Sequence, residues 1–176
     1  MSASVTLSQE HKYYIERALE EAQRCRPVPT AFSVGCVLVT RWPGAVPVIL
    51  ACGYSRELLG NTHAETNALN KAHTLTTSQI QALFPSISPP PTLDAIFAHT
   101  EAYTTLEPCS VRTSGLAPCA DALVKSGIRR CIIGVGEPDD FVKCDGAQKL
   151  QNANIEVVWF EGLEKECLNA ARRGHE

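Results

Sequence analysis

The sequence predicts an α/β domain of three layers (α/β/α), in which helices cover both faces of a mixed five-stranded central sheet. Its second half alternates short apolar strands with helices, the order typical of parallel strands. Its first half holds two apolar, β-branched runs separated by turn residues, which predict an antiparallel hairpin. The 176 residues are 44% hydrophobic, enough for one core without disulfides or a partner. We therefore expect a single domain over residues 1–176.

The N-terminal helix and the hairpin follow from local patterns. Apolar residues recur at helical spacing over 8–25, with charged residues between them, and Pro27 ends this helix. The apolar runs 31–40 and 46–53 are joined by turn residues around Gly44. We expect these two runs to form adjacent strands.

A second helix is expected over 61–72, with Thr62 as a plausible cap. The next stretch, 74–93, is rich in Ser, Thr and Pro, so we expect a surface insertion within the domain rather than a linker between domains. Strands and helices then alternate to the end of the chain: strand 102–106, helix 117–126, strand 129–135, helix 147–152, strand 155–160 and helix 162–172.

The composition argues against nucleic acid and membrane partners. The chain has 16 basic and 19 acidic residues, a net charge of −3, and its Lys and Arg residues are scattered. No apolar run approaches the roughly 20 residues that span a bilayer, and the first residues lack the pattern of a signal peptide. We expect a cytoplasmic protein whose eight cysteines are thiols or metal ligands.

Two short segments contain the ligand types that zinc prefers. His63 lies at the start of one expected helix, and Cys109 and Cys119 lie between a strand and the next helix. Helix N-termini favour thiolate over thiol. One histidine and two cysteines leave the fourth position of a tetrahedral zinc open for water, which is typical of catalytic zinc. We expect one Zn²⁺ per chain, held by His63, Cys109 and Cys119.

Glu65 follows His63 by two residues, close enough to reach the water without binding the metal, so we expect it to be the catalytic proton shuttle. H-x-E followed by P-C-x-x-C is the signature of zinc-dependent base deaminases. Here nine residues, 110–118, separate the two cysteines, so a loop must extend between them. This loop holds Arg112 and Ser114 at the mouth of the site. A simple solvated charge is the alternative for Arg112.

Three longer runs carry a resemblance to a known family: GYSRELLGNTHAET, TTLEPCSVRTSGLAPC and GVGEPDDFVKCDG. They resemble the riboflavin-biosynthesis pyrimidine deaminases of yeast and fungi, within the cytidine deaminase superfamily. The resemblance implies a cytidine deaminase-like fold and a hydrolase that acts on a cyclic amidine C–N bond. The implied substrate is 2,5-diamino-6-ribitylamino-4(3H)-pyrimidinone 5′-phosphate, and the implied products are 5-amino-6-ribitylaminouracil 5′-phosphate and ammonia.

The resemblance also implies a substrate site. It places Asn61 beside the pyrimidine ring and Thr30 on the loop that leads into the first strand. Backbone amides of Ala64 and Cys109 are expected to stabilise developing charge. The other polar residues expected around the substrate are Ser110, Arg112, Ser114, Glu137, Asp139 and Lys143. For Lys143, a structural salt bridge is an equal alternative to a phosphate contact.

Two other functional classes remain open at this point. One is a different deaminase of the same fold, acting on a nucleoside, a free base or tRNA. The net charge argues against tRNA, and the long cysteine spacer argues against cytidine. The other is a non-enzymatic binding module stabilised by zinc, which would need a fourth protein ligand, with Cys144 the nearest candidate. The resemblance also implies a homodimer, because the relatives usually assemble through helices beside the active site.

Overall fold

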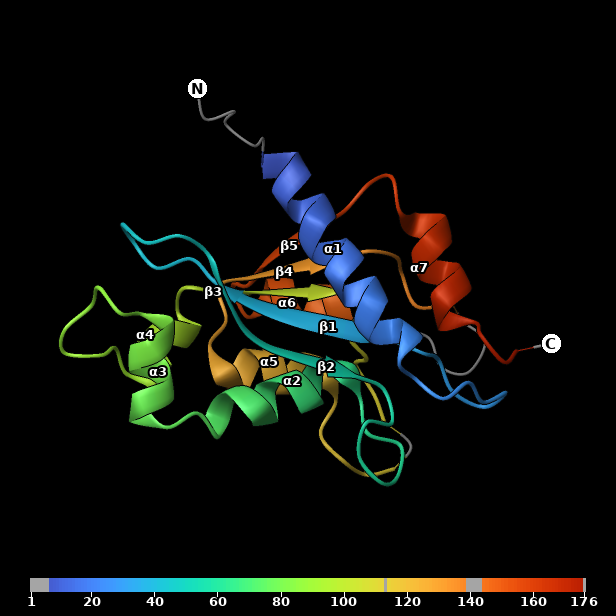
Figure 1. Cartoon of the computed structure of the whole chain (residues 1–176). Coiled ribbons are helices and arrows are strands. Elements are labelled where there is room, and N and C mark those ends of the chain that lie inside the picture. The colour runs from blue at the N-terminus through green and yellow to red at the C-terminus, as the bar shows by residue number, and fades with distance from the viewer. Residues whose placement is uncertain (1–6, 113, 139–143, 176) are drawn as a thin grey trace.

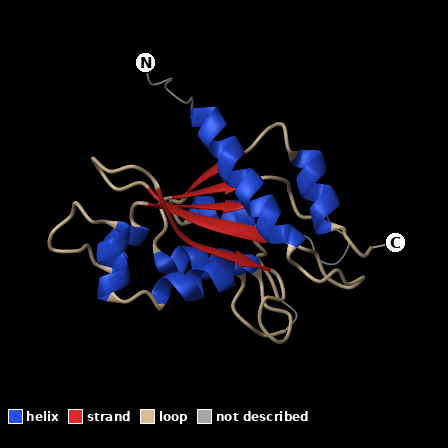
Figure 2. Cartoon of the chain, in the orientation of Figure 1, coloured by secondary structure: helices blue, strands red, loops and turns tan. Residues whose placement is uncertain are grey.

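The computed structural model describes residues 7–112, 114–138 and 144–175. They form a five-stranded sheet between two layers of helices (Figures 1 and 2). The strands are β1 (Gly35–Thr40), β2 (Val48–Tyr54), β3 (Thr100–Thr104), β4 (Arg130–Ile133) and β5 (Glu156–Trp159). The helices are α1 (Leu7–Gln23), α2 (Ala64–His73), α3 (Thr77–Leu83), α4 (Leu93–Phe97), α5 (Cys119–Ser126), α6 (Gly146–Asn152) and α7 (Glu164–Ala171). The predicted three-layer fold with a mixed sheet is confirmed.

The strand order is β2-β1-β3-β4-β5, with α1 and α7 on one face of the sheet and α2, α5 and α6 on the other (Figure 1). β1 runs antiparallel to β2 and β3, whereas β3, β4 and β5 run parallel. Gly35 at the start of β1 pairs with Tyr54 at the end of β2, and Cys36 pairs with Thr104 at the end of β3. The loop before β1 and the loops after β2, β3 and β4 therefore meet at one edge of the sheet. Ligands of open α/β sheets bind at such an edge.

Two glycines allow helices to approach the sheet closely. A Cβ on Gly53 of β2 would lie 2.4 Å from the carbonyl oxygen of Ala64 and 2.6 Å from the amide nitrogen of Ala68, both in α2. A Cβ on Gly35 of β1 would lie 1.9 Å from the carbonyl oxygen of Ala18 in α1. Only glycine fits at these distances. The first turn of α2 is thereby held directly against the strand that leads to it.

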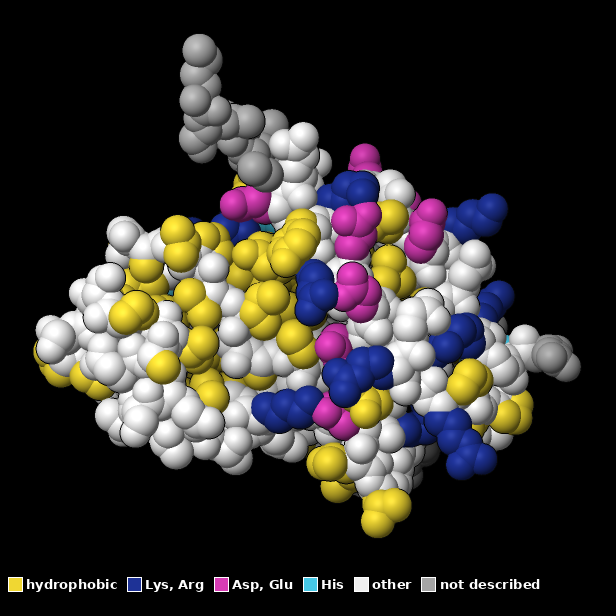
Figure 3. All heavy atoms as spheres, in the orientation of Figure 1, with side chains coloured by type: hydrophobic (Ala, Val, Ile, Leu, Met, Phe, Trp, Pro, Cys, Tyr) yellow, Lys and Arg dark blue, Asp and Glu magenta, His cyan; other side chains and the backbone are white. Residues whose placement is uncertain are grey.

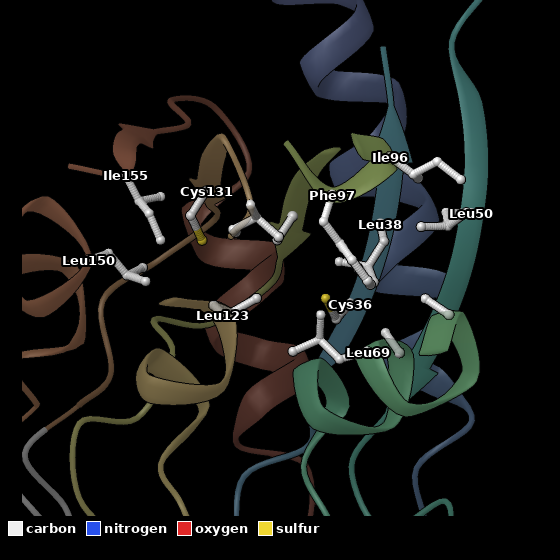
Figure 4. Packing of buried hydrophobic residues seen from close by; sticks show 14 of the residues in the cluster. Cys36, Leu38, Leu50, Leu69, Ile96, Phe97, Leu123, Cys131, Leu150 and Ile155 are labelled. Atoms are coloured by element: carbon white, nitrogen blue, oxygen red, sulfur yellow. The ribbon is translucent and has the colours of Figure 1, made fainter. Parts of the chain in front are cut away.

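Buried apolar side chains fill the layer between the sheet and α2, α5 and α6 (Figure 4). Leu38 of β1, Leu69 of α2 and Leu123 of α5 are at most 3% exposed. A second cluster, which includes Ile15 of α1 and Cys167 of α7, fills the opposite layer. Burial of each large aliphatic side chain contributes about 1.5–3 kcal/mol. The loops at the sheet edge are therefore connected to strands and helices that pack firmly on both faces of the sheet.

The stretch 74–93 contains α3 and the start of α4, two helices that the sequence analysis did not predict. The side chain of Thr76 accepts a hydrogen bond from the Gln79 amide, and Gln79 in turn accepts one from the Thr76 amide. This capping box was present in the sequence as T-x-x-Q but was hidden by the surrounding Ser, Thr and Pro residues. Ile80 and Phe84 are buried in the same core cluster as α2, so this segment packs onto the domain.

The predicted elements are present, and most of their ends lie within two residues of the expected positions, but two elements begin three or four residues later than expected. The strand expected over 31–40 begins at Gly35, and the helix expected over 61–72 begins at Ala64. His63 has extended backbone angles (φ −102°, ψ 152°) and its side chain makes no capping hydrogen bond. The residues left outside these elements lie in loops at the sheet edge, where their side chains are available for a site.

No described helix is both long and apolar enough to cross a membrane. On the face shown in Figure 3, basic and acidic side chains are interleaved. On α1, Lys12 pairs with Glu16 and Arg17 pairs with Glu20. This face alternates in charge rather than presenting the basic surface that nucleic-acid binding requires.

Candidate metal centre and active site

A cavity of about 480 Å³ opens at the edge of the sheet where the loops meet. Four chain segments contribute to its lining: the loop before β1, the loop after β2 with the start of α2, the loop after β3, and the loop after β4. Its volume is within the range of about 300–1,000 Å³ that is typical of small-molecule sites. The cavity is lined by both His63 and Glu65, so the candidate metal ligand and the candidate acid–base residue face the same space.

His63 and Cys109 line this cavity, and the buried Cys119 lies beside them. His63 Nδ1 is 3.5 Å from Cys109 Sγ and 3.4 Å from Cys119 Sγ. A tetrahedral zinc, about 2.0–2.1 Å from nitrogen and about 2.3 Å from sulfur, holds such ligands about 3.6 Å apart. All three potential ligand atoms lie within 4.8 Å of one another, and no other such cluster occurs among the residues that the structure describes. The donor set and its spacing therefore fit one zinc ion with an open fourth position.

The electrostatic surroundings favour an ionised sulfur at this centre. The pKa of the Cys109 thiol is lowered to about 4, because the Cys119 side chain and backbone N–H donate hydrogen bonds to it and His63 lies beside it. The pKa of the Cys119 thiol, at the first position of α5, is raised well above its ordinary value, because this thiol donates to Cys109 and is buried. Thiolate is the form that binds zinc, so the hydrogen bonds of the cluster favour the metal-binding form of Cys109.

Glu65 lies in the first turn of α2 and is only 3% exposed. Its Oε1 accepts a hydrogen bond from Thr104 Oγ1 at 3.2 Å, which links it to the end of β3. Burial raises the pKa of Glu65, and the neighbouring Cys109 sulfur raises it further. A carboxyl group whose pKa is raised toward neutrality is suited to accepting and returning a proton.

The structure brings most of the predicted substrate residues to one cavity. Six of them line it: Thr30, Asn61, Ser110, Arg112, Ser114 and Glu137. Ala64 does not line the cavity among the described residues, but it is buried at the first position of α2, between His63 and Glu65. Asp139 and Lys143 lie outside the described residues.

Two of these polar side chains also connect the loops around the cavity. Arg112 Nη2 donates a hydrogen bond of 2.6 Å to the carbonyl oxygen of Asn61, which joins the cysteine-spacer loop to the loop after β2. Ser110 Oγ accepts a hydrogen bond of 3.1 Å from the Asp145 amide, which joins the same loop to the start of α6. Arg112 is therefore neither a free charge in solvent nor solely a group that faces the cavity.

Glu137 and Cys144 form a second polar pair in the cavity wall. Burial raises the pKa of Glu137 to about 7, although a hydrogen bond with the Cys144 thiol lowers it in part. Cys144 Sγ also donates to the carbonyl oxygen of Pro108 at 3.5 Å, and it is not part of the metal cluster. The fourth structural ligand that the binding-module alternative requires is therefore not supplied by Cys144.

Sequence reasoning missed several residues of this site. Phe32, Val34, Ser55, Leu106, Val111 and Cys144 also line the cavity. Two residues that do not line it bind the loop before β1: Arg56 from the loop after β2, and Arg173 from the C-terminal segment, which donates to the carbonyl oxygen of Cys25 at 2.9 Å. Arg173 and Cys25 are 148 positions apart. Only the fold brings them together, so no local pattern identified this contact.

Residues 8–135 of the chain match the family described as the cytidine and deoxycytidylate deaminase zinc-binding region. The diaminohydroxyphosphoribosylamino-pyrimidine deaminase of Schizosaccharomyces pombe is 37% identical over 175 residues, which are 99% of this chain and 38% of that protein. The riboflavin biosynthesis protein RibD of Escherichia coli K12 is 32% identical over 173 residues, covering 93% of this chain and 39% of RibD. The chain thus spans well under half the length of these two relatives.

Solved structures show the same similarity. The Rib2 deaminase of Aspergillus oryzae in complex with DARIPP, a C-terminal deletion mutant at pH 6.5, superposes with a TM-score of 0.73 at 33% identity, covering 94% of this chain and 92% of that chain. These relatives confirm the resemblance that the three sequence runs indicated. The zinc-binding family and the cluster of His63, Cys109 and Cys119 together confirm the predicted zinc cofactor. The chain belongs to the zinc-binding cytidine and deoxycytidylate deaminase family.

Proposed function

We propose that this chain is a zinc-dependent hydrolytic deaminase of riboflavin biosynthesis. Its proposed substrate is 2,5-diamino-6-ribitylamino-4(3H)-pyrimidinone 5′-phosphate, which it converts to 5-amino-6-ribitylaminouracil 5′-phosphate and ammonia. The observation that carries the proposal is the buried Glu65 carboxyl facing the same cavity as a three-ligand zinc site. The names of the fungal and bacterial relatives support a pyrimidine deaminase of riboflavin biosynthesis. The choice of the ribitylamino over the ribosylamino compound rests on the resemblance of the sequence to the fungal enzymes.

The zinc ion, held by His63, Cys109 and Cys119, supplies when bound a Lewis acid that lowers the pKa of water toward neutrality. In the proposed reaction Glu65 accepts a proton from the attacking water. It delivers this proton to the ring nitrogen, then accepts the second proton from the hydroxyl group now on the ring carbon. It passes that proton to the leaving amine, so the C–N bond breaks, ammonia leaves and a carbonyl group remains. Its hydrogen bond from Thr104 holds the carboxyl group in place during both transfers. The backbone amides of Ala64 and Cys109 are proposed to stabilise the negative charge that develops on the substrate.

We propose that Asn61 contacts the pyrimidine ring and that the remaining polar residues of the site recognise the ribityl phosphate. Thr30, Ser110, Ser114 and Glu137 supply hydroxyl and carboxyl groups around the cavity. Arg112 supplies a cation, which a phosphate dianion requires. Asp139 and Lys143, which lie between β4 and α6 in the sequence, are proposed to complete the set.

We also propose that the protein works in the cytoplasm as a homodimer. All eight cysteines are free thiols, as a reducing compartment requires. Leu58, Leu59, Val111 and Leu116 are between 56% and 101% exposed on the two loops beside the cavity. Exposed apolar side chains grouped in this way favour a protein–protein contact. Neither nucleic acid nor a membrane is proposed as a partner.

Anaerobic incubation of the zinc-loaded protein with the ribitylamino phosphate, followed by measurement of ammonia release, tests the proposal. Cytidine and the unreduced ribosylamino compound are the matched controls. We expect release from the ribitylamino compound and at least tenfold less from cytidine. Turnover of cytidine in preference to the ribitylamino compound would indicate the other deaminase class. Full zinc occupancy without turnover of any of the three compounds would favour the binding-module alternative.

A further inference from the structure

One wall of the cavity is a loop with little regular structure of its own. We call residues 26–33 the wall loop, because Thr30, Ala31 and Phe32 line the cavity. Outside the named strands it contains one isolated bridge, between Val28 and Ala31. The backbone carbonyl groups of such a loop need donors from elsewhere in the chain to hold a single conformation.

Arg56 supplies most of these donors from the loop after β2. Its Nη1 donates to the carbonyl oxygen of Phe32 at 2.8 Å, and its Nη2 donates to the hydroxyl of Ser33 at 2.9 Å. Its Nε and Nη2 both donate to the carbonyl oxygen of Arg26, at 3.2 and 3.0 Å. One guanidinium group therefore binds both ends of the wall loop, on either side of the residues that line the cavity.

The setting of Arg56 does not resemble that of an ordinary ion pair. Among the described residues no salt bridge involves Arg56, and its acceptors are two backbone carbonyls and one hydroxyl. Burial lowers the pKa of the guanidinium group. Its backbone is in the left-handed region (φ 60°), which is uncommon for a residue other than glycine. The half-buried guanidinium group therefore acts as a hydrogen-bond donor to several acceptors at once, which a surface charge in an ion pair would not do.

We propose that Arg56 is a positioning residue that sets the shape of the substrate cavity by fixing the wall loop against the segment that carries Asn61 and His63. Its backbone N–H also donates to the carbonyl oxygen of Thr62 at 2.6 Å, immediately before His63. Arg56 is not among the described residues that line the cavity, so it acts through the wall loop rather than on substrate. This inference rests on the proposed deaminase function for its kinetic test.

The proposal predicts a split between binding and chemistry. The hydrogen bonds of the Arg56 side chain go to Arg26, Phe32 and Ser33, and none goes to a zinc ligand or to Glu65. The side chain is therefore needed for the shape of the cavity and not for proton transfer. We expect Arg56→Met to raise the KM for the ribitylamino phosphate at least tenfold while kcat per bound zinc stays within threefold of the original. Arg56→Lys, which can replace only some of the hydrogen bonds, should have an intermediate KM.

Arg129→Met is the matched control, because Arg129 is exposed and lies far from the cavity. Its backbone N–H donates to the carbonyl oxygen of Thr100, at the end of β3 opposite the cavity. We expect it to change neither KM nor kcat. If Arg56 only stabilises the fold, both Arg56 variants will have a lower folded fraction and a lower kcat per total protein, and their KM will be unchanged. That result would overturn the proposal.

Hydrogen exchange of the zinc-loaded protein gives a second readout that needs no substrate. In Arg56→Met, amides of residues 26–33 should exchange at least tenfold faster, while amides of the loop after β3 and of α2 keep their rates. Uniformly faster exchange, or unchanged exchange in 26–33, would contradict the proposal. If the ribitylamino phosphate is not a substrate, the exchange measurement still decides whether Arg56 holds the wall loop, so the two failures are distinguishable.

Discussion

Glu65 combines burial, a hydrogen bond from Thr104 and a place in the first turn of α2, two residues from His63. We expect Glu65→Gln to keep the shape of the side chain but remove its ability to exchange a proton. The value of kcat should fall by about a hundredfold or more, as is typical when a general acid–base group is lost. The measurement is ammonia release per bound zinc. Near-normal turnover, with zinc content unchanged, would show that another group transfers the proton.

Arg112 has two candidate roles, because it lines the cavity and also donates to the carbonyl oxygen of Asn61. If it binds the phosphate, Arg112→Ala should raise KM for the phosphorylated substrate more than for its dephosphorylated form. A charge-assisted hydrogen bond is worth about 1.5–3 kcal/mol, which corresponds to about a ten- to hundredfold change. The test compares KM for the two compounds in both proteins. An equal change for both compounds would assign Arg112 to holding the loop.

At the scale of elements, the contact between β2 and α2 places His63 and Glu65 relative to the sheet. We expect Gly53→Ala to push α2 away, because the new Cβ would lie 2.4 Å from the carbonyl oxygen of Ala64. Overpacking of this kind costs about 1–3 kcal/mol in the free energy of unfolding. Urea denaturation and kcat should both report the change. Gly136→Ala is the control, because its Cβ would lie no closer than 3.8 Å to any described group other than its chain neighbours. Equal effects of the two variants would contradict the proposal that the close contact of Gly53 with α2 positions His63 and Glu65.

At the scale of the whole molecule, a buried charge cluster lies at the end of the sheet opposite the cavity. Glu101 is 1% exposed and accepts hydrogen bonds from Arg41 (2.7 Å), Tyr103 (2.8 Å) and Arg130 (3.0 Å). Burial by itself raises the pKa of Glu101, but these donors outweigh it, so the pKa lies below its ordinary value. The pKa of His11, which contacts Tyr103 at 2.9 Å, is lowered by burial.

Both pKa values are lowered on folding, so at these two groups the unfolded chain binds protons more readily, and their contribution to the free energy of unfolding falls with decreasing pH. The raised pKa values of Glu65 and Glu137 act in the opposite direction. The loss should begin near the ordinary pKa of histidine, about 6.5, and continue below that of glutamate, about 4.3. We expect Glu101→Gln to lower the free energy of unfolding at pH 7 by about 3 kcal/mol and to flatten its decline below about pH 5. Urea denaturation from pH 7 to 4 measures this. The control is Glu16→Gln, because the Glu16 side chain is 45% exposed and pairs with Lys12 at the surface. An unchanged pH profile in Glu101→Gln would contradict the assignment.

The fold class and the zinc cofactor were predictable from the sequence alone, and the sequence also proposed Glu65 as the acid–base residue. Periodicity reports which residues are buried, so the strands and helices were predictable wherever burial is regular. His63, Glu65, Cys109 and Cys119 were predictable because their residue types have few other combined uses than zinc chemistry. Element ends were less predictable. The residues just before β1 and α2 are not in regular structure, and three of them, Thr30, Asn61 and His63, line the cavity.

Only the tertiary structure decided which residues shape the cavity. The antiparallel pairing of β1 with β2 and β3 brings the wall loop, the loop after β2 and the loop after β3 to one edge of the sheet. Arg56, Cys144 and Arg173 are distant in sequence from the segments that they contact, by up to 148 positions. Arginine and cysteine occur throughout this chain with ordinary roles, so their types alone carry no signal. Such contacts depend on how packed elements meet, and that information is absent from any local window of sequence.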